Sequence, residues 1–291
     1  MGGVDASIAI ATCSELPDGD EDAGLLAEAL RSLSIDLTMC VWDDPTIDWE
    51  AHDLVVLRSP WDYTTKLSAF RAWVSSLSRV YNESPVVGWN TDKRYLEDLR
   101  RRQIPVIETT YVDDPEVFEV PAAEWFVIKP TVGAGSIGAE RFGGRQEDEA
   151  RRHVAALVSH GLVAMVQPYL EQVDVSGETG VILIDGVPCH AIEKAALLTV
   201  REIDRSGLFR SESIRARPLD ATHVDLALLA HEAACDALHR DAPLLYARVD
   251  MLPSQEGPVV IEFEATEPSL FLTHAPASAS VLADAIRRRL G

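Results

Sequence analysis

The sequence predicts an α/β protein in which an N-terminal open parallel sheet precedes two lobes of mixed α and β structure. Three observations support this fold class. Short β-rich runs alternate with helical patterns along the 291 residues, which is typical of α/β architecture. The pattern changes at Asn90, and after Pro168 it turns to longer strands that pair as hairpins. Hydrophobic residues make up 47% of the chain, enough to build a sizeable core.

The first 90 residues carry the pattern of a small parallel sheet with covering helices. Short apolar runs predict its strands at residues 7–12, 38–42, 53–58 and 85–89. Segments with apolar residues on one helical face predict the covering helices at residues 20–33 and 68–80. We therefore expect an N-terminal α/β domain at residues 1–90.

Residues 91–170 are expected to form a small lobe. Asn90-Thr91-Asp92 is a helix-start sequence, because short polar side chains can accept from the free N–H groups of a first helical turn. Helices are predicted at residues 93–102 and 147–160. Strands are predicted at residues 107–111, 125–130, 138–142 and 162–167.

Residues 171–291 are expected to form the larger C-terminal lobe. Asp185-Gly186 favours a tight hairpin turn between two strands. The strands of this lobe are predicted at residues 179–184, 187–193, 246–252 and 259–263, and its helices at residues 222–238 and 277–290. Between Leu197 and Pro218 lies a polar, Arg-rich segment without clear periodicity, and a long loop of this kind is often a lid.

Composition and charge exclude several classes of protein. The formal net charge of −21 disfavours a nucleic-acid partner, because phosphate backbones require an excess of Lys and Arg. The four cysteines are widely spaced, without a CxxC pair or a His cluster at zinc spacing. No signal-peptide pattern or long apolar run indicates secretion or a membrane span. We expect a cytoplasmic protein with reduced thiols that contacts neither nucleic acid nor membrane.

The first chemical feature is a lysine at the end of a strand. The predicted strand 125–130 delivers Lys129, and a loop of small residues follows at once with Gly133, Gly135 and Ser136. Glycines let backbone N–H groups approach phosphate oxygens, and a lysine adds a positive charge. The alternative is a Gly-rich hairpin with a solvated lysine. The sequence is not a Walker A loop, which needs Gly-Lys-Ser/Thr before a helix.

The second feature is an extended segment between two lobes, formed by Gln167, Pro168, Tyr169 and Leu170. Such a segment can offer backbone groups to the edge of an adenine ring while apolar side chains enclose the ring. A plain interdomain linker is the alternative, and this segment alone favours the linker.

The third feature is acidic. Arg248 and Asp250 lie on one predicted strand, and Glu262 and Glu264 lie two residues apart on the next, so the two glutamates project from the same face. Three carboxylates around one point repel each other unless a cation is present, and oxygen ligands suit Mg²⁺. The alternative is an acidic stripe facing solvent. The buried character of the residues around Ile261 favours a cleft and a metal site.

In this order, the three features resemble the ATP-grasp superfamily from about Trp89 to the C-terminus, and the first 90 residues are similar to the α/β domain that precedes it. The segment Asn90-Thr91-Asp92-Lys93, the segment from Arg58 to Tyr63, and the Glu-x-Glu-x-x-Glu-Pro-Ser ending at Ser269 are similar to the glutathione-synthetase-like group. One departure is Glu264, which replaces an asparagine common in the superfamily. The extra negative charge should strengthen Mg²⁺ binding.

The resemblance implies ATP and Mg²⁺ as cofactors and assigns a role to most of these residues. Lys93 and Lys129 would hold nucleotide phosphates beneath the loop Gly133–Gly138, and Lys194 would lie near the γ-phosphate. The remaining assignments are the adenine segment Gln167, Tyr169 and Leu170, the ribose ligand Glu178 or its rival Asp174, and the metal ligands Asp250, Glu262 and Glu264.

The resemblance also implies a reaction. A substrate carboxylate would attack the γ-phosphate to give an acyl phosphate, with Lys129, Lys194 and Arg248 as catalytic cations, and a nitrogen would then displace phosphate. Within the group, the chain is most similar to cyclo-ligases that close O-ureido-D-serine to D-cycloserine. The alternatives are an intermolecular carboxylate–amine ligase and, in another class, a sensor module that binds ATP without turnover.

An amino-acid-like small molecule is the expected substrate, bound between the lobes. Arg58 could pair with its carboxylate and Asp62 with its ammonium group, because both follow the end of a strand. A helix cap or a surface ion pair is the alternative for each. His190 and Ser269 are further candidates for this cleft, and a homodimer is expected by resemblance alone.

Overall fold

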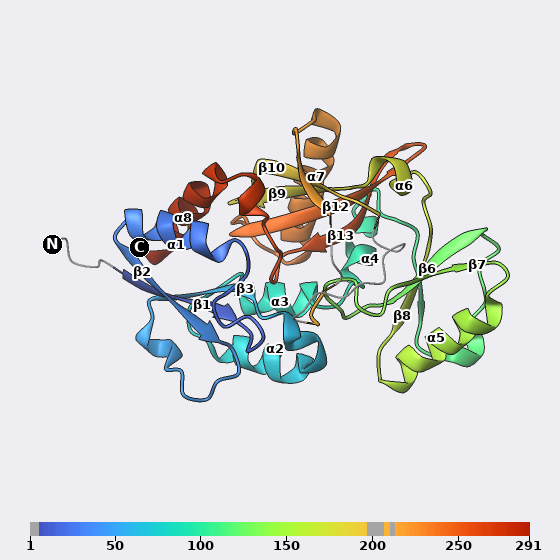
Figure 1. Ribbon diagram of the computed structural model, residues 1–291, viewed down its shortest axis with the longest axis horizontal. Coiled ribbons are helices and arrows are strands. Elements are labelled where there is room, and N and C mark those ends of the chain that lie inside the picture. Colours follow the sequence, from blue (N-terminus) through green and yellow to red (C-terminus); the bar gives the residue numbers. More distant parts are fainter. Residues whose placement is uncertain (1–5, 197–206, 210–212) are drawn as a thin grey trace.

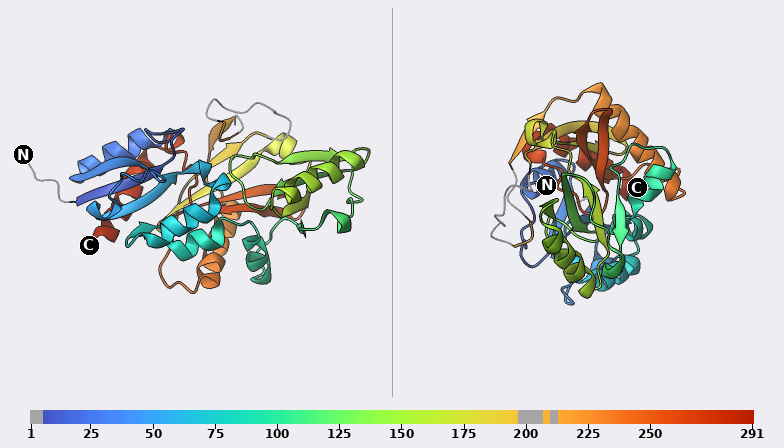
Figure 2. Two further views of the ribbon diagram at one scale, coloured as in Figure 1. Left: turned by 90° about the horizontal axis from the view of Figure 1, so that it is seen from below. Right: turned by 90° about the vertical axis from the view of Figure 1, so that its right-hand side faces the viewer.

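The computed structural model describes residues 6–196, 207–209 and 213–291 (Figure 1). These residues form three sheets that follow one another along the long axis of the molecule (Figures 1 and 2). The N-terminal sheet lies at one end, a small antiparallel sheet at the other, and a five-stranded sheet between them. The predicted α/β fold is confirmed.

The N-terminal sheet is entirely parallel, with strand order β2-β1-β3-β4. Its strands are β1 (Ala6–Thr12), β2 (Ile35–Val41), β3 (Leu54–Ser59) and β4 (Val80–Tyr81). The helices of this region are α1 (Ala23–Ser32), α2 (Leu67–Ser76) and α3 (Ser84–Asn90), with short 3₁₀ turns η1 (Trp49–Ala51) and η2 (Trp61–Thr65). The central strands β1 and β3 are mostly buried because helices and the C-terminal lobe cover the sheet, whereas the edge strand β2 is partly exposed.

Residues 85–89, predicted as a strand, are helical and belong to α3. Pro85 lies in the first turn of this helix, where a missing N–H costs nothing, and Glu83 before it is extended. Val86 and Val87 are both buried, which explains why the sequence resembles a strand. The fourth strand is β4 instead, and the prediction had placed its first residue, Val80, at the end of a helix.

The helix predicted to begin at Asn90-Thr91-Asp92 begins later, as α4 (Tyr95–Arg101). Asn90 is the last residue of α3, and its side chain serves another purpose. Its amide donates to the Phe263 carbonyl at 2.6 Å, and its oxygen accepts from the Ala265 and Thr266 N–H groups at 2.7 and 2.9 Å. Asn90 therefore fastens the end of the acidic strand to the N-terminal region.

The small lobe is a four-stranded antiparallel sheet of order β5-β8-β6-β7. Its strands are β5 (Thr110–Val112), β6 (Trp125–Pro130), β7 (Glu140–Gly143) and β8 (Ala164–Pro168), with the turn η3 (Pro115–Val117) after β5. Helix α5 (Glu147–Ser159) packs its apolar face on the sheet. β6 has the bounds that the sequence predicted, and Lys129 lies near its end.

The C-terminal lobe is a five-stranded antiparallel sheet of order β11-β10-β9-β12-β13. Its strands are β9 (Glu178–Ile184), β10 (Val187–Lys194), β11 (Ile214–Arg217), β12 (Tyr246–Ser254) and β13 (Gly257–Glu264). Its helices are α6 (Val173–Ser176), α7 (Ala221–Ala237) and α8 (Ala277–Leu290), with the turn η5 (Leu272–His274). Asp185 and Gly186 both have positive φ, as expected for the tight turn between β9 and β10.

The two ends of the chain share one core. Helix α8 packs beside α1 (Figure 1), and residues of both helices join the same apolar cluster as β9 and β10. This contact anchors the N-terminal sheet to the C-terminal lobe and closes one side of the space between them.

The expected lid falls mostly outside the described residues. Of the segment from Leu197 to Pro218, residues 197–206 and 210–212 are not described, while Ile214–Arg217 forms strand β11. In the part of the chain that the structure covers, no helix has the length and apolarity needed to cross a bilayer.

Candidate active site

A cavity of about 800 Å³ lies where the three sheets meet, within the range usual for small-molecule sites. The chain has only four lysines, and three of them, Lys93, Lys129 and Lys194, line this cavity. In a chain with a net charge of −21, so strong a concentration of lysine indicates an anionic ligand.

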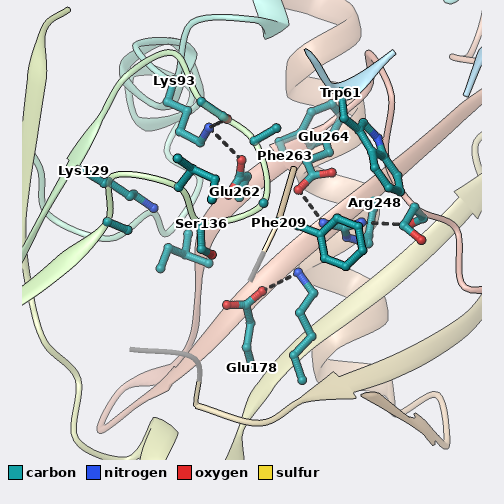
Figure 3. Close-up of a pocket in the computed structure, with 18 of the residues that line it drawn as sticks. Trp61, Lys93, Lys129, Ser136, Glu178, Phe209, Arg248, Glu262, Phe263 and Glu264 are labelled. Carbon is teal, nitrogen blue, oxygen red and sulfur yellow. Dashed lines mark hydrogen bonds and ion pairs between the residues drawn. The ribbon is translucent and has the colours of Figure 1, made fainter. Parts of the chain in front are cut away.

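Lys93 and Lys129 approach the cavity from different elements, and their positive charges have different partners. Lys93 Nζ donates to the Gly133 carbonyl at 2.6 Å and lies 3.0 Å from a carboxylate oxygen of Glu262. Lys129 forms no ion pair with any described carboxylate. Burial lowers the pKa of Lys129, and the nearby ammonium groups of Lys93 and Lys194 add to that effect. Figure 3 shows Lys93 and Lys129 on the same side of the cavity as Glu262 and Ser136.

The small-residue loop folds back over the two lysines. Gly135 has φ +57°, a left-handed conformation that favours glycine. A Cβ atom there would lie 2.4 Å from Cβ of Phe209 and 2.5 Å from the Leu208 carbonyl oxygen. The ring of Phe209 meets Trp61 edge to face at 5.6 Å (Figure 3), so elements from three parts of the chain meet above the loop.

The predicted adenine segment lines the opposite end of the cavity from Trp61. Gln167, Tyr169 and Leu170 face it together with apolar residues of neighbouring strands, which include Val127, Leu252 and Ile261. The Gln167 side-chain amide donates to the Thr109 hydroxyl at 2.9 Å, and the Tyr169 N–H donates to the Trp125 carbonyl at 3.0 Å, so the segment is fixed along the edge of β6. This end is therefore a mainly apolar slot with an extended backbone along one side.

The two rival ribose ligands are placed differently. Glu178 lines the cavity, and its carboxylate lies 2.8 Å from Lys194 Nζ. Asp174 is turned away: it accepts from the Tyr169 hydroxyl at 2.5 Å and lies 3.9 Å from Arg141. Of the two carboxylates, Glu178 is the one that the fold presents to a ligand.

A buried network of charges forms the floor of the cavity. The carboxylate of Asp250 is 1% exposed and is held by Arg248 at 2.9 Å and by Lys194 at 2.8 Å. Burial acts to raise the pKa of Asp250, but the charges of Arg248 and Lys194 prevail and keep it below its ordinary value. Arg248 also pairs with Glu264 and donates to the Ser269 carbonyl at 2.8 Å. The register of β12 against β13, with Arg248 opposite Glu264 and Asp250 opposite Glu262, sets this pattern.

Glu262 and Glu264 both line the cavity, as the strand spacing predicts, but their charges are balanced unequally. For Glu262, burial is outweighed by Lys93 and Lys129, and its pKa is lowered. For Glu264, burial raises the pKa to about 8, and the charges of Glu262 and Asp250 add to this although Arg248 opposes it. Burial is therefore the main cause of the raised pKa of Glu264, and its ion pair with Arg248 only partly offsets it.

These carboxylates bear on the expected magnesium site. Among the residues that the structure describes, no three His, Cys, Asp or Glu side chains gather closely enough to bind a metal ion. Asp250 does not line the cavity, because Arg248 and Lys194 cover it. Glu262 and Glu264 offer carboxylate oxygens to the cavity, and a divalent cation there would stabilise the ionised form of the buried Glu264. These two glutamates fit magnesium.

Of the four predicted substrate residues, only Ser269 lines the cavity. Arg58 is 2% exposed and lies 3.5 Å from Asp20 and 3.6 Å from Asp22. The loop between β1 and α1, which carries these two aspartates, covers the end of β3. Arg58 is therefore a buried cation beneath the cavity wall, and the expectation that it faces the substrate is not met.

Asp62 and His190 also lie behind the wall. Asp62 accepts from the Trp42 ring N–H at 2.7 Å and pairs with Lys66 at 2.8 Å, on the side of η2 away from the cavity. His190 is hydrogen bonded to the Leu270 carbonyl at 2.8 Å, and burial lowers its pKa. These two residues hold the elements that form the wall and do not reach the cavity themselves.

Several residues that line the cavity near Trp61 were not among the predicted site residues. Tyr63 and Glu267 line the cavity, and Tyr63 hydrogen bonds to the Glu267 carboxylate. The Trp61 ring N–H donates to the Glu267 carbonyl at 2.9 Å. Both segments were part of the family resemblance, so the signal was present, but nothing in it predicts that residues about 200 positions apart meet.

Comparison with known proteins agrees with this geometry. The family model described as D-cycloserine synthetase DcsG, N-terminal domain, matches residues 8–82. The Cycloserine biosynthesis protein DcsG of Streptomyces lavendulae is 37% identical over 290 residues, which covers 93% of this chain and 94% of that protein.

Solved structures give the same result. A crystal structure of D-cycloserine synthetase DcsG matches with a TM-score of 0.89 and 35% identity, and covers 98% of this chain and 100% of that one. The ATP-grasp ligase PsnB, complexed with a precursor variant, Mg and ADP, matches with a TM-score of 0.62 and 18% identity over 99% and 100% of the two chains. That second likeness shows the fold alone. The chain belongs to the family of D-cycloserine synthetase DcsG, and it is an ATP-grasp ligase.

Proposed function

We propose that this chain uses ATP to close O-ureido-D-serine to D-cycloserine through an acyl phosphate. The observation that carries the proposal is the division of one cavity into two ends. One end is an apolar slot beside Lys93 and Lys129, and the other is an acidic space beside Arg248. The name of the 37% identical relative supports the choice of product.

In this proposal the nucleotide occupies the slot lined by Gln167, Tyr169 and Leu170. Lys93 and Lys129 contact its phosphates, and the backbone of the loop around Gly135 covers them. Because Lys129 has no carboxylate partner among the described residues, a phosphate oxygen meets it without displacing an existing ion pair. Lys93 exchanges part of its contact with Glu262 for the phosphate.

Glu262 and Glu264 would hold magnesium, which neutralises the charge of the triphosphate when bound. The substrate lies beside Arg248 and Ser269, with its carboxylate toward the γ-phosphate. Oxygen of that carboxylate bonds to the γ-phosphorus, and the bond from phosphorus to ADP breaks. Arg248 and Lys194, already fixed by Asp250, keep positive charge at the acyl phosphate without reorganising during the step.

Ring closure then needs no second substrate. The ureido nitrogen bonded to oxygen attacks the acyl carbon, and phosphate leaves. The bond from that nitrogen to the carbamoyl carbon breaks, so the carbamoyl group departs as isocyanic acid and the proton lost from its terminal nitrogen ends on phosphate. Because both groups belong to one molecule, the step avoids the entropic cost of bringing two reactants together. The cavity's acidic end is enclosed by Trp61, Tyr63 and Phe209, which favours a folded substrate over an extended pair of amino acids.

The test is release of ADP and formation of product with Mg²⁺-ATP and a panel of amino acids, each with and without an added amine. O-ureido-D-serine alone is expected to give ADP together with D-cycloserine. Turnover only with an acid and a separate amine would identify an intermolecular ligase instead. ATP binding without substrate-dependent ADP release would identify a nucleotide-binding sensor.

A further inference from the structure

Four carboxylates on β12, β13 and the segment that follows β13 lie in or under the cavity, and three of them are paired with a cation. Asp250 is held by Arg248 and Lys194, Glu262 by Lys93, and Glu264 by Arg248. Glu267 forms no ion pair with any described residue. Its carboxylate is held instead by a neutral donor, the hydroxyl of Tyr63.

Glu267 is nevertheless fixed firmly at the cavity surface. The Trp61 ring N–H donates to its carbonyl at 2.9 Å, and Tyr63, which is 3% exposed, stacks on Phe70 at 4.7 Å. Thr266 and Ala265 just before it are held by the Asn90 side chain at 2.9 and 2.7 Å. A carboxylate held this rigidly beside a reaction centre, without a cation to occupy it, is free to accept a proton.

We propose that Glu267 is the general base for ring closure, accepting the proton that the ureido group loses as the new nitrogen–carbon bond forms. This inference depends on the proposed function, because a base is needed here only if the carbamoyl group of the substrate must lose a proton as the ring closes. Tyr63 and Trp61 act as positioning residues for it.

D-cycloserine lacks the carbamoyl group of the substrate, so the bond between the attacking nitrogen and the carbamoyl carbon must break. A proton passes from the terminal carbamoyl nitrogen to Glu267, and the carbamoyl group leaves as isocyanic acid. The electron pair of the broken bond stays with the attacking nitrogen, which bonds to the acyl carbon. The bond from that carbon to the phosphate oxygen breaks, and the released phosphate takes the proton from Glu267.

The environment of Glu267 suits this task. Burial raises its pKa to about 7, the Tyr63 hydrogen bond and the charges of Lys93 and Arg248 oppose the rise, and the charge of Glu262 adds to it. A base works best when its pKa lies near the working pH, because it is then both ionised and basic enough to take a proton. Asp250, Glu262 and Glu264 are already paired with cations, and the two glutamates would also hold the metal, so these three carboxylates are less available to accept a proton.

The experiment separates the two chemical steps with hydroxylamine, which intercepts acyl phosphates as hydroxamates and needs no protein base. In Glu267→Gln, D-cycloserine formation should fall by about 10²- to 10⁴-fold. Hydroxamate formation from ATP and O-ureido-D-serine should stay within about threefold of the wild-type rate, an effect below ~1 kcal/mol. The matched control is Glu256→Gln, the same change at an exposed residue of the β12–β13 turn, which should leave both rates unchanged.

Two further variants test the arrangement. Glu267→Asp keeps a carboxylate and should recover part of the lost cyclisation, whereas Tyr63→Phe keeps the stacked ring and should slow cyclisation by about tenfold without slowing hydroxamate formation. If hydroxamate formation falls with cyclisation in Glu267→Gln, the residue acts in binding or activation and the inference is wrong. If cyclisation is unaffected, it is equally wrong. Failure of the wild-type protein to form D-cycloserine would instead overturn the proposed function itself.

Discussion

Lys129 and Glu267 stand at the two ends of one cavity, and each carries a charge that no described ion pair neutralises. Burial shifts both toward their neutral forms: it lowers the pKa of Lys129 and raises that of Glu267 to about 7. Their neighbours Lys93 and Glu262 form an ion pair with each other at 3.0 Å. On the proposed function, the unpaired cation is available to an anionic ligand and the unpaired carboxylate to a proton, while the paired charges between them hold the site together.

The largest effect is expected from removing the cation. Lys129→Met should lower kcat/KM for ATP by about 10³-fold, because a buried ammonium aimed at phosphate is replaced by an apolar chain of similar length. The measurement is ADP release as a function of ATP concentration. Lys66→Met is the matched control: Lys66 is the one lysine outside the cavity, paired with Asp43 and Asp62. Similar kinetics for the two variants would mean that Lys129 does not contact the nucleotide.

Arg58 is a buried cation outside the cavity, so its removal should affect stability and not catalysis. Arg58→Met should lower the free energy of unfolding by about 3 kcal/mol, because Asp20 and Asp22 are left buried without their partner. The KM for O-ureido-D-serine should change little. Urea unfolding and steady-state kinetics measure the two quantities. Arg31→Met, on the exposed face of α1, serves as control and should stay within about 0.5 kcal/mol. A raised KM together with unchanged stability would mean that Arg58 contacts the substrate.

The contrast between these residues also shows what could be read from the sequence. Lys129, Glu262 and Glu264 were predicted to share a site, and they do line one cavity, because strand ends and strand alternation are local properties. The N-terminal sheet was predicted for the same reason, apart from residues 85–89, where buried valines in a short helix imitate a strand.

The substrate end could not be predicted in this way. Arg58 and His190 have the residue types that bind amino acids, but whether they face the cavity depends on partners far along the chain. Asp22, which covers Arg58, also accepts from the Leu272 N–H, 250 residues away. Glu267 meets Tyr63 and Trp61 across a similar distance. Such contacts are products of the tertiary fold, and periodicity contains no information about them.

The buried carboxylate of Glu267 should also lower the free energy of unfolding at neutral and alkaline pH. A stability measurement therefore tests its environment independently of catalysis. Its folded pKa, about 7, lies above the ordinary value of 4.5, so the carboxylate favours folding below pH 4.5 and disfavours it progressively as pH rises to about 7. In the free protein without Mg²⁺, Glu267→Gln should therefore be relatively more stable at pH 8 than at pH 5, by about 2 kcal/mol.

Urea unfolding at the two pH values measures this difference. Glu256→Gln, at an exposed turn, should show the same stability difference from the wild type at both pH values. A Glu267→Gln variant that is less stable than the wild type at pH 8 would show that the glutamate makes a stabilising contact in the folded state, contrary to the environment described above.

The smallest effect concerns the loop that joins the two ends. Gly135→Ala should raise the KM for ATP by about tenfold, because a Cβ at φ +57° is strained and would collide with Phe209 and the Leu208 carbonyl. ADP release at varied ATP concentration measures it, and the ring closure rate at saturating ATP should fall less. Gly144→Ala is the matched control, since a Cβ at Gly144 meets no atom within 4 Å. Equal KM values for the two variants would mean that the loop leaves Phe209 when ATP binds, so that the contact above Gly135 belongs to the free enzyme only.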